Sequence, residues 1–349
     1  MNVTRNWAYT LKGKRYVGAR QPALHDGRAF GVFHYQKGSF YESVLYCINA
    51  ASGIERWQFT VPHILNAPVV DTEGYVYLSS FDGQVHCLDG ASGQIRWQTP
   101  KTRTNVNVPV LDHHGRVVVP DLSSQTAQVR CFDTSSGQLR WQIPTGGHTY
   151  VAAISEGRVI YSTARRKEGV ILSCVSLDNG HVLWQIPSEH YMFHPVVQTG
   201  VIYIGSHGEL RAYDLQNGTL LTTLSLQKDF AVNAQLLLYN DMLYFGDGEG
   251  QCYAVEITTD RDVPTQSVQY NLRWQSQTTD EVAAQPVYIQ DVVAFLSKDG
   301  SVHLLEAQSG ALVKQVKLKT RNDFGGMHYD NRRLYVAHGR ELICYDVQD

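Results

Sequence analysis

The stretch VHCLDGASGQIRWQ (residues 85–98) brings together residue types that could do chemistry. A thiol beside a carboxylate could act as an activated nucleophile. An exposed tryptophan could stack on a cofactor. The question is whether Cys87, Asp89 and Trp97 form a reactive site or belong to the fold, and the rest of the chain answers it.

Copies of this stretch recur along the chain, and the tryptophans mark the period. Trp57, Trp97, Trp141 and Trp184 are separated by 40, 44 and 43 residues. Trp274 follows two repeats later, with Thr222 at the intervening position. Counting on from Trp274 past the C-terminus and back to the N-terminus, Trp7 lies two repeats further. Lys314 occupies the tryptophan position of the repeat between them. The sequence therefore contains eight units whose period runs through both termini.

Each unit has the pattern of one small antiparallel sheet. An apolar stretch, an alternating strand, the VHCLD-type strand and the QIRWQ-type strand follow one another, separated by turns rich in glycine. Four-stranded units of about 40 residues, repeated four to eight times, are typical of a β-propeller. We predict an all-β, eight-bladed propeller of four-stranded antiparallel blades forming one domain over residues 1–349. The expected blades are 18–60, 64–100, 105–145, 149–187, 193–226, 231–277, 282–318, and 325–349 completed by 3–11.

The two ends of the chain carry complementary parts of a blade. LICYDV (342–347) matches the third strand of a unit but has no fourth strand after it, whereas RNWAYTL (5–11) matches a fourth strand with no unit before it. Pairing these strands would satisfy both open edges. We therefore expect the N-terminal strand to pair with the C-terminal blade and close the ring.

Composition restricts the possible partners. The formal net charge is -3, and no stretch of about 18 apolar residues is present. We therefore expect one or more protein partners, no nucleic acid and no membrane span. The first residues contain neither an apolar signal segment nor a cysteine for lipid attachment, which favours a cytoplasmic protein, or an exported one if a signal peptide has been removed.

The cysteines share a repeat position that other residue types also fill. Cys47, Cys87, Cys131, Cys174 and Cys344 stand where Ala212, Ala254 and Leu304 stand in other units, and Cys252 lies two residues earlier in its unit. A position that accepts Cys, Ala or Leu is expected to be a buried apolar slot. We interpret these thiols as structural; disulfides or metal ligation are the alternative.

Repeat register assigns other polar residues to one rim of the ring. In a propeller, the loops between blades and the turns between second and third strands share a rim, where ligands commonly bind. His34 and Glu281 belong there. The candidate ligand- or partner-binding residues are His63, Asn66, Asn105, Asn107, His148, Tyr150, His190, Tyr191, His194, His207, Asn233, Asp280, Asp323, His328 and His338. No metal-binding spacing such as HxH occurs, so a metal site would need loops from several blades to converge. Plain solvated loops remain the alternative.

Two further segments depart from the pattern. The basic run 165–167, with Lys101 and Arg103, could bind phosphate, although acidic neighbours favour solvated charges. The insertion 258–271 replaces a tight turn on the opposite rim with a longer polar segment. It could form a partner contact or a tolerated loop extension.

The unit resembles the repeat of the PQQ-like (quinoprotein-type, BamB-like) eight-bladed propeller family. Gly53, Gly93, Gly137 and Gly180 precede tryptophan by four residues, and Asn49, Asp89, Asp133, Asp214, Glu306 and Asp346 fall at the polar position of the pattern. The resemblance implies that the acid braces a turn and that the glycine adopts positive φ. It also implies a tryptophan-docking motif, in which the indoles pack between blades as structural docking residues: Trp7, Trp57, Trp97, Trp141, Trp184 and Trp274.

The family includes PQQ-dependent alcohol dehydrogenases and an outer-membrane-assembly lipoprotein. The dehydrogenases carry long inserted loops, a vicinal cysteine pair and a calcium-binding set of Glu, Asn and Asp. Here the repeats are minimal and no CC pair occurs. We therefore predict a non-enzymatic protein-interaction scaffold or recognition subunit of a larger complex, with no cofactor and no catalytic residues. The alternative is a PQQ-dependent dehydrogenase-like protein with calcium, or a small-ligand sensor, with its site at the central rim.

Overall fold

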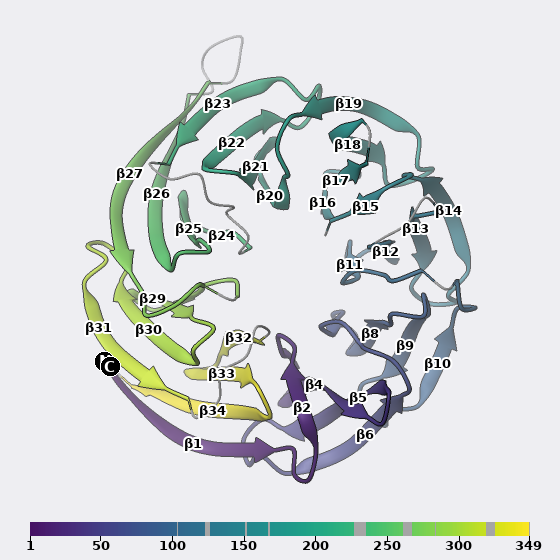
Figure 1. Cartoon of the computed structure of the whole chain (residues 1–349), viewed down its shortest axis with the longest axis vertical. Coiled ribbons are helices and arrows are strands. Elements are labelled where there is room, and N and C mark those ends of the chain that lie inside the picture. Colours follow the sequence, from purple (N-terminus) through teal and green to yellow (C-terminus); the bar gives the residue numbers. More distant parts are fainter. Residues whose placement is uncertain are drawn as a thin grey trace.

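The computed structural model describes residues 1–102, 104–122, 126–150, 152–166, 168–226, 235–260, 267–282, 284–318 and 325–348. Within these residues the chain forms strands and turns and no helix. The strands make eight antiparallel sheets arranged in a ring (Figure 1). We call the space along the ring axis, where residues of several first strands line a cavity, the central channel. The predicted all-β, eight-bladed propeller is confirmed.

The blades follow one another along the chain. Blade 1 contains β2 (Arg15–Ala19), β3 (Ala23–His25), β4 (Arg28–Lys37), β5 (Phe40–Asn49) and β6 (Glu55–Val61). Blade 2 contains β7 (Val69–Val70), β8 (Tyr75–Ser79), β9 (Val85–Asp89) and β10 (Ile95–Gln98). Blade 3 contains β11 (Val110–Leu111), β12 (Arg116–Pro120), β13 (Gln128–Asp133) and β14 (Leu139–Pro144). Blade 4 contains β15 (His148–Thr149), β16 (Ala153–Ser155), β17 (Arg158–Arg165), β18 (Gly169–Ser176) and β19 (Val182–Ser188).

The second half of the ring has the same order. Blade 5 contains β20 (Phe193–Gln198), β21 (Val201–Ser206), β22 (Glu209–Asp214) and β23 (Leu220–Ser225). Blade 6 contains β24 (Leu237–Tyr239), β25 (Met242–Gly246), β26 (Gln251–Asp260) and β27 (Ser267–Gln277). Blade 7 contains β28 (Val287–Ile289), β29 (Val292–Leu296), β30 (Ser301–Glu306) and β31 (Leu312–Lys317). Blade 8 contains β32 (Gly325–Asp330), β33 (Arg333–His338), β34 (Glu341–Gln348) and, from the other end of the chain, β1 (Asn2–Thr10).

Blade 8 closes the ring. β1 pairs antiparallel with β34, and Trp7 lies opposite Cys344. The side chain of Asn6 also donates to both carboxylate oxygens of Asp346, at 2.9 and 2.8 Å. Both ends of the chain lie side by side (Figure 1). The predicted closure by the N-terminal strand is confirmed.

Within each blade the first strand lines the channel and the fourth strand lies on the outside (Figure 1). Several inner strands are very short because a proline precedes them: Pro68 stands before β7 and Pro109 before β11. Proline has no backbone N–H and cannot donate to a neighbouring strand. The channel wall is therefore only partly regular sheet.

The core consists of the apolar faces between adjacent blades, and the cysteines belong to it. All six thiols are free and fully buried. Ala212 and Leu304, at the equivalent position in other blades, are also fully buried. Burial raises the pKa of the Cys87 thiol to about 12, so it stays protonated at neutral pH. The predicted buried apolar slot is confirmed.

Each indole contacts the next blade in the same way. The six indole N–H groups donate to backbone carbonyls of Ala50, Gly90, Thr134, Leu177, Leu215 and Ala307 at 2.7–3.3 Å. In each case the residue whose carbonyl accepts comes directly after the polar residue of its repeat in the sequence, as Gly90 comes after Asp89. In the same turn Asp89 accepts the backbone N–H groups of Ala91 and Ser92, and Gly93 has a φ of +74°. A Cβ on Gly93 would lie 2.7 Å from the Trp57 ring, so a side chain there would displace the indole.

Two blade junctions lack a tryptophan, and each has a substitute. Between blades 7 and 8, Lys314 donates from Nζ to the carbonyl of Val3 at 2.9 Å. Between blades 5 and 6, where Thr222 replaces tryptophan, the insertion extends the β26–β27 hairpin. Tyr270 from that extension packs 6.3 Å from the Tyr203 ring. Tyr203 lies on the second strand of blade 5. On the equivalent strand of blade 2, Tyr77 packs against the tryptophan of that blade, Trp97, so Tyr270 contacts Tyr203 where a tryptophan is found in other blades.

The described part of the insertion therefore fills the space of a missing tryptophan. Ile257 and Val268 from the extended hairpin are buried in the same cluster as Tyr203. This packing role differs from both expected roles of the insertion. Residues 261–266, at its tip, lie outside the described part of the chain.

Candidate recognition site on the upper rim

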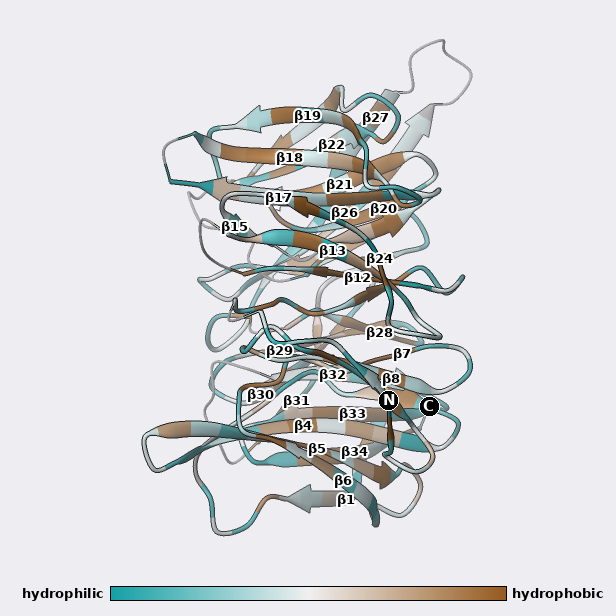
Figure 2. Ribbon diagram, turned by 90° about the vertical axis from the view of Figure 1, so that its right-hand side faces the viewer, coloured by the Kyte–Doolittle hydropathy of each residue, from teal (hydrophilic) through white to brown (hydrophobic). Residues whose placement is uncertain are grey.

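Loops on one side of the ring carry most of the predicted site residues. We call this side the upper rim; it contains the loops between blades and the turns between second and third strands. The β4–β5 and β17–β18 hairpins project on this side, whereas the β26–β27 hairpin projects on the opposite side, the lower rim (Figure 2).

An aromatic cluster connects blades 4 and 5 on the upper rim. The Tyr150 ring lies 4.9 Å from His148, 6.2 Å from Tyr191 and 5.1 Å from Phe193, measured between centroids. His207 continues the cluster, 6.5 Å from Tyr191 and 6.1 Å from His190. The cluster comprises His148, Tyr150, His190, Tyr191, Phe193 and His207, of which all but Phe193 were predicted rim residues.

A cavity of about 550 Å³ adjoins this cluster. Arg165, Arg166 and Glu189 line it together with Tyr150 and Tyr191. Arg165 is anchored by Glu168 at 2.7 Å and by the carbonyl of Thr145, whereas Arg166 is exposed.

Burial controls the charge of the aromatic part. It lowers the pKa of His148 and raises the pKa of Tyr150 to about 12, so both rings are neutral at pH 7. The His148–Tyr150 part of the cluster is thus a neutral aromatic surface, and arginine and glutamate border it.

Other predicted residues have local partners. His63 lies with its Nε2 3.4 Å from Oδ2 of Asp82, which Lys101 also contacts at 3.0 Å. The Asn66 side chain is buried, with an exposed fraction of 5%. Its amide donates to the Ser79 hydroxyl and to the Val106 carbonyl of blade 3. Asn66 therefore links blades 2 and 3.

The backbones of the neighbouring asparagines pair with the following strand. The carbonyl of Asn105 accepts from the backbone N–H of Leu122, and the backbone N–H of Asn107 donates to the carbonyl of Pro120. Both side chains are partly buried.

The remaining predicted residues are spread around the ring. His34 and His338 are buried, and burial lowers the pKa of His34 and of the partly buried His194 to about 4. Asp280 accepts the backbone N–H of Glu281, which pairs with Lys298. His328 lines the central channel. Asn233, Asp323, Arg103 and Lys167 lie outside the described residues.

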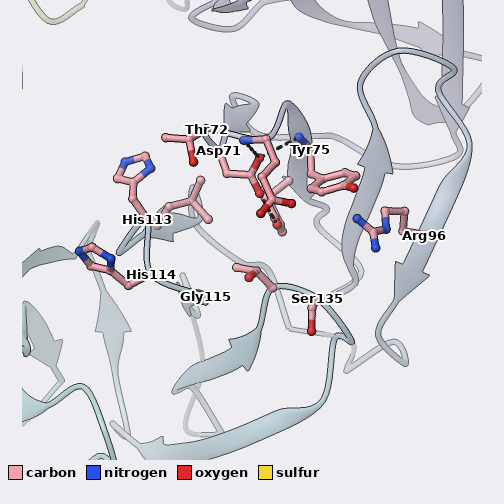
Figure 3. A pocket seen from close by; sticks show the side chains of 12 residues that line it. Asp71, Thr72, Tyr75, Arg96, His113, His114, Gly115 and Ser135 are labelled. Carbon is pink, nitrogen blue, oxygen red and sulfur yellow. Dashed lines mark hydrogen bonds between the residues drawn. The ribbon is translucent and has the colours of Figure 1, made fainter.

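Sequence reasoning did not identify two exposed features. Phe40 and Tyr41 stand at the tip of the β4–β5 hairpin, and the Phe40 side chain is 76% exposed. On the lower rim, between blades 2 and 3, Asp71, Tyr75, Arg96, His113 and His114 line a cavity of about 360 Å³ (Figure 3). In that cavity Arg96 stacks 3.9 Å from the Tyr75 centroid, and Asp71 accepts the Tyr77 hydroxyl. The repeated turn motifs gave no signal that separates these residues from ordinary turn residues.

Calcium-bound PQQ, the cofactor of the dehydrogenase alternative, would need a set of oxygen ligands, because calcium takes six to eight, largely carboxylates. Within the described ranges, no group of three or more His, Cys, Asp and Glu side chains is placed to hold a metal ion. The described residues that line the cavity presented below include no Asp or Glu. All six indole N–H groups are directed to neighbouring blades, as given above.

This architecture defines the class: an eight-bladed β-propeller built from tryptophan-containing repeats. The family model described as outer membrane protein assembly factor BamB matches residues 41–187 and 111–316. The chain belongs to this family of PQQ-like, BamB-like propellers. None of the curated proteins matches it. In the part of the chain that the structure describes, no helix has the length and apolar character needed to span a membrane.

Solved structures with the same fold have different activities. BamB from Moraxella catarrhalis is 16% identical, with a TM-score of 0.72 over 99% of this chain and 100% of that chain. Quinohemoprotein alcohol dehydrogenase ADHIIG from Pseudomonas putida HK5 is 12% identical, with a TM-score of 0.72 over 99% of this chain and 76% of that chain. A europium-containing methanol dehydrogenase is 12% identical, with a TM-score of 0.70 over 99% and 93%. These similarities establish the fold alone.

Proposed function

We propose that the chain is a non-enzymatic scaffold or recognition subunit that binds a partner protein through the upper rim. The observation that carries this proposal is the aromatic cluster beside Arg165 and Arg166. Tyrosine, phenylalanine and arginine are enriched at the centres of protein interfaces, where they supply most of the binding energy. Tyr191 is 45% exposed in this cluster, so much of its surface is available to a partner.

The position of the cluster supports the same function. Four of its six residues belong to loops held by two rigid blades, while His148 and Phe193 begin strands β15 and β20. Loops on rigid scaffolds commonly carry binding residues. Phe40 and Tyr41 on the β4–β5 hairpin offer a second aromatic contact on the same rim. A large partner could therefore contact separate blades at once.

Affinity purification from the native host tests the proposal. The wild-type chain is compared with the double variant Tyr191→Ala, Arg166→Ala and with Tyr239→Ala. Tyr239 is a matched control because it is 42% exposed, stacks on Tyr288 and is the last residue of β24, beside a turn of the lower rim. We expect a protein that is recovered with the wild type and Tyr239→Ala but reduced at least tenfold with the double variant. Equal recovery with all three chains would contradict binding through the cluster.

A second measurement separates the scaffold from the dehydrogenase alternative. PQQ and Ca²⁺ are added to the purified protein while the visible absorbance of PQQ is followed. The scaffold proposal predicts that no saturable change occurs. Saturable binding at micromolar concentration would favour the dehydrogenase alternative instead.

A further inference from the structure

The central channel contains a cavity of about 430 Å³ that is separate from the aromatic cluster. Most of its wall comes from the first strands of blades 1, 2 and 3 and the residues just before them. The lining residues are Gln21, Pro22, Ala23, Leu24, Ala67, Pro68, Val69, Val70, Val108, Pro109, Val110, Leu111, His113, Ala152, Gln235 and His328. Pro22, Pro68 and Pro109 occupy equivalent positions, so the repeat itself builds this apolar wall.

The lining selects against charge. Among the described residues that line it, none is Asp, Glu, Lys or Arg. Burial lowers the pKa of His328, so its imidazole is neutral at pH 7. An ion entering this cavity would lose hydration without gaining a counter-charge from a described Asp, Glu, Lys or Arg side chain, which is unfavourable.

The lining is nevertheless suited to a small molecule. Ligand cavities usually have about 300–1,000 Å³, a mainly apolar wall and a few polar groups that orient the ligand. Here Gln21, Gln235 and His328 supply hydrogen-bonding groups beside proline, valine and leucine side chains. Water is held poorly by such a wall because each buried water needs two to four polar partners.

We infer that this channel cavity binds an uncharged small molecule whose surface is mainly aliphatic or aromatic. One or two polar atoms of the molecule would bond to Gln21, Gln235 or His328. This binding is independent of the protein partner proposed for the upper rim. A side chain of a partner inserted into the channel is the competing occupant, and it would require that partner to be present.

The purified chain alone, titrated with the uncharged dye Nile red, tests the inference by fluorescence. We expect one saturable site per chain. The anionic dye 1-anilinonaphthalene-8-sulfonate should displace Nile red only poorly, because no Lys or Arg among the described lining residues could pair with its sulfonate.

Two cavity variants and one control locate the site. Val108→Asp introduces a charge and Ala67→Phe fills space; both residues line the cavity but lie outside the packed apolar clusters, so the fold should persist. We expect each variant to weaken Nile red binding at least tenfold. Val182→Asp on β19, where the side chain is 50% exposed, should bind as the wild type does. Circular dichroism spectra check that the variants remain folded.

Three outcomes would overturn the inference: no saturable binding to the wild type, undiminished binding to both cavity variants, or loss of binding in Tyr191→Ala with the cavity intact. The last outcome would place the dye on the upper rim. None of them bears on partner recovery, so failure here is distinguishable from failure of the scaffold proposal.

Discussion

The indole N–H of Trp97 donates a 2.7 Å hydrogen bond to the backbone carbonyl of Thr134, across the boundary between blades 2 and 3. The ring also covers Gly137, where a Cβ would lie 2.6 Å from the indole. The bond and the packing both depend on an indole at this position. Because a propeller blade cannot bury both of its faces alone, such contacts should stabilise the whole ring.

Substitution of Trp97 should separate the two contributions. Trp97→Phe removes the hydrogen bond and should lower the free energy of unfolding by about 1–3 kcal/mol. Trp97→Ala also leaves a cavity and should cost about 3–5 kcal/mol. Urea denaturation monitored by circular dichroism measures both. Ile95→Ser on the same strand, at a side chain 47% exposed, should change little. An unchanged urea midpoint for Trp97→Ala would refute the role assigned to the indole.

Removal of residues 1–12 should destabilise the entire protein, because β1 is the fourth strand of blade 8. Its loss would expose the edge of β34 and open the ring. Thermal melting measures the effect, and a large drop in Tm is expected. A circular permutant with the original ends joined by a glycine–serine linker, opened between the exposed residues His113 and His114, is the control. It keeps β1 paired and should melt near the wild-type temperature. Equal Tm for the truncated and intact chains would contradict the role of β1.

The sequence predicted the ring because the information for each blade is local and repeated. Turn glycines such as Gly93 and strand residues such as Cys87 recur at one spacing, and closure followed from an unmatched strand at each end. Register also assigned His148, Tyr150 and Tyr191 to one rim. Their convergence required only that blades 4 and 5 be neighbours.

What the sequence did not predict depends on contacts between blades. Asn66 looked like a free rim amide, but its partner carbonyl at Val106 lies 40 residues away in blade 3. Phe193 could not be distinguished from a core aromatic residue of a strand. The channel cavity arises because apolar residues of several first strands face one axis, and strand periodicity does not separate a channel face from a packed face.

Buried His34 should make the protein less stable in acid. Desolvation and the nearby Arg20 lower its folded-state pKa to about 4, whereas the unfolded value is 6.5. Between these values the unfolded chain binds a proton that the folded chain does not, so stability falls as pH drops from 6.5 to 4. The loss from this residue should reach about 3 kcal/mol.

Urea denaturation at pH 7, 6, 5 and 4.5 measures this loss. His34→Gln should reduce the dependence on pH, whereas Ile95→Ser, at an exposed residue that does not titrate, should leave it unchanged. The same slope in wild type and His34→Gln would show that His34 does not titrate as described.

Tyr270 and Thr222 should be energetically coupled, because the tyrosine fills the space that a tryptophan at 222 would occupy. Tyr270→Ala should lower the free energy of unfolding, by less than the ~3–5 kcal/mol of a fully buried aromatic residue because Tyr270 is partly buried. Thr222→Trp should also destabilise the wild type, since two large rings would compete for the volume beside Tyr203.

Combining the two changes tests this exchange of residues. The variant with Thr222→Trp and Tyr270→Ala should be more stable than Tyr270→Ala alone, by 1 kcal/mol or more, because the new indole refills the junction between blades 5 and 6. A double-mutant cycle measured by urea denaturation gives the coupling energy. The pair Thr222→Trp and Tyr239→Ala is the control, since Tyr239 on β24 stacks on Tyr288 instead and should be additive with residue 222. Additive effects of the first pair would show that Tyr270 does not replace the missing tryptophan.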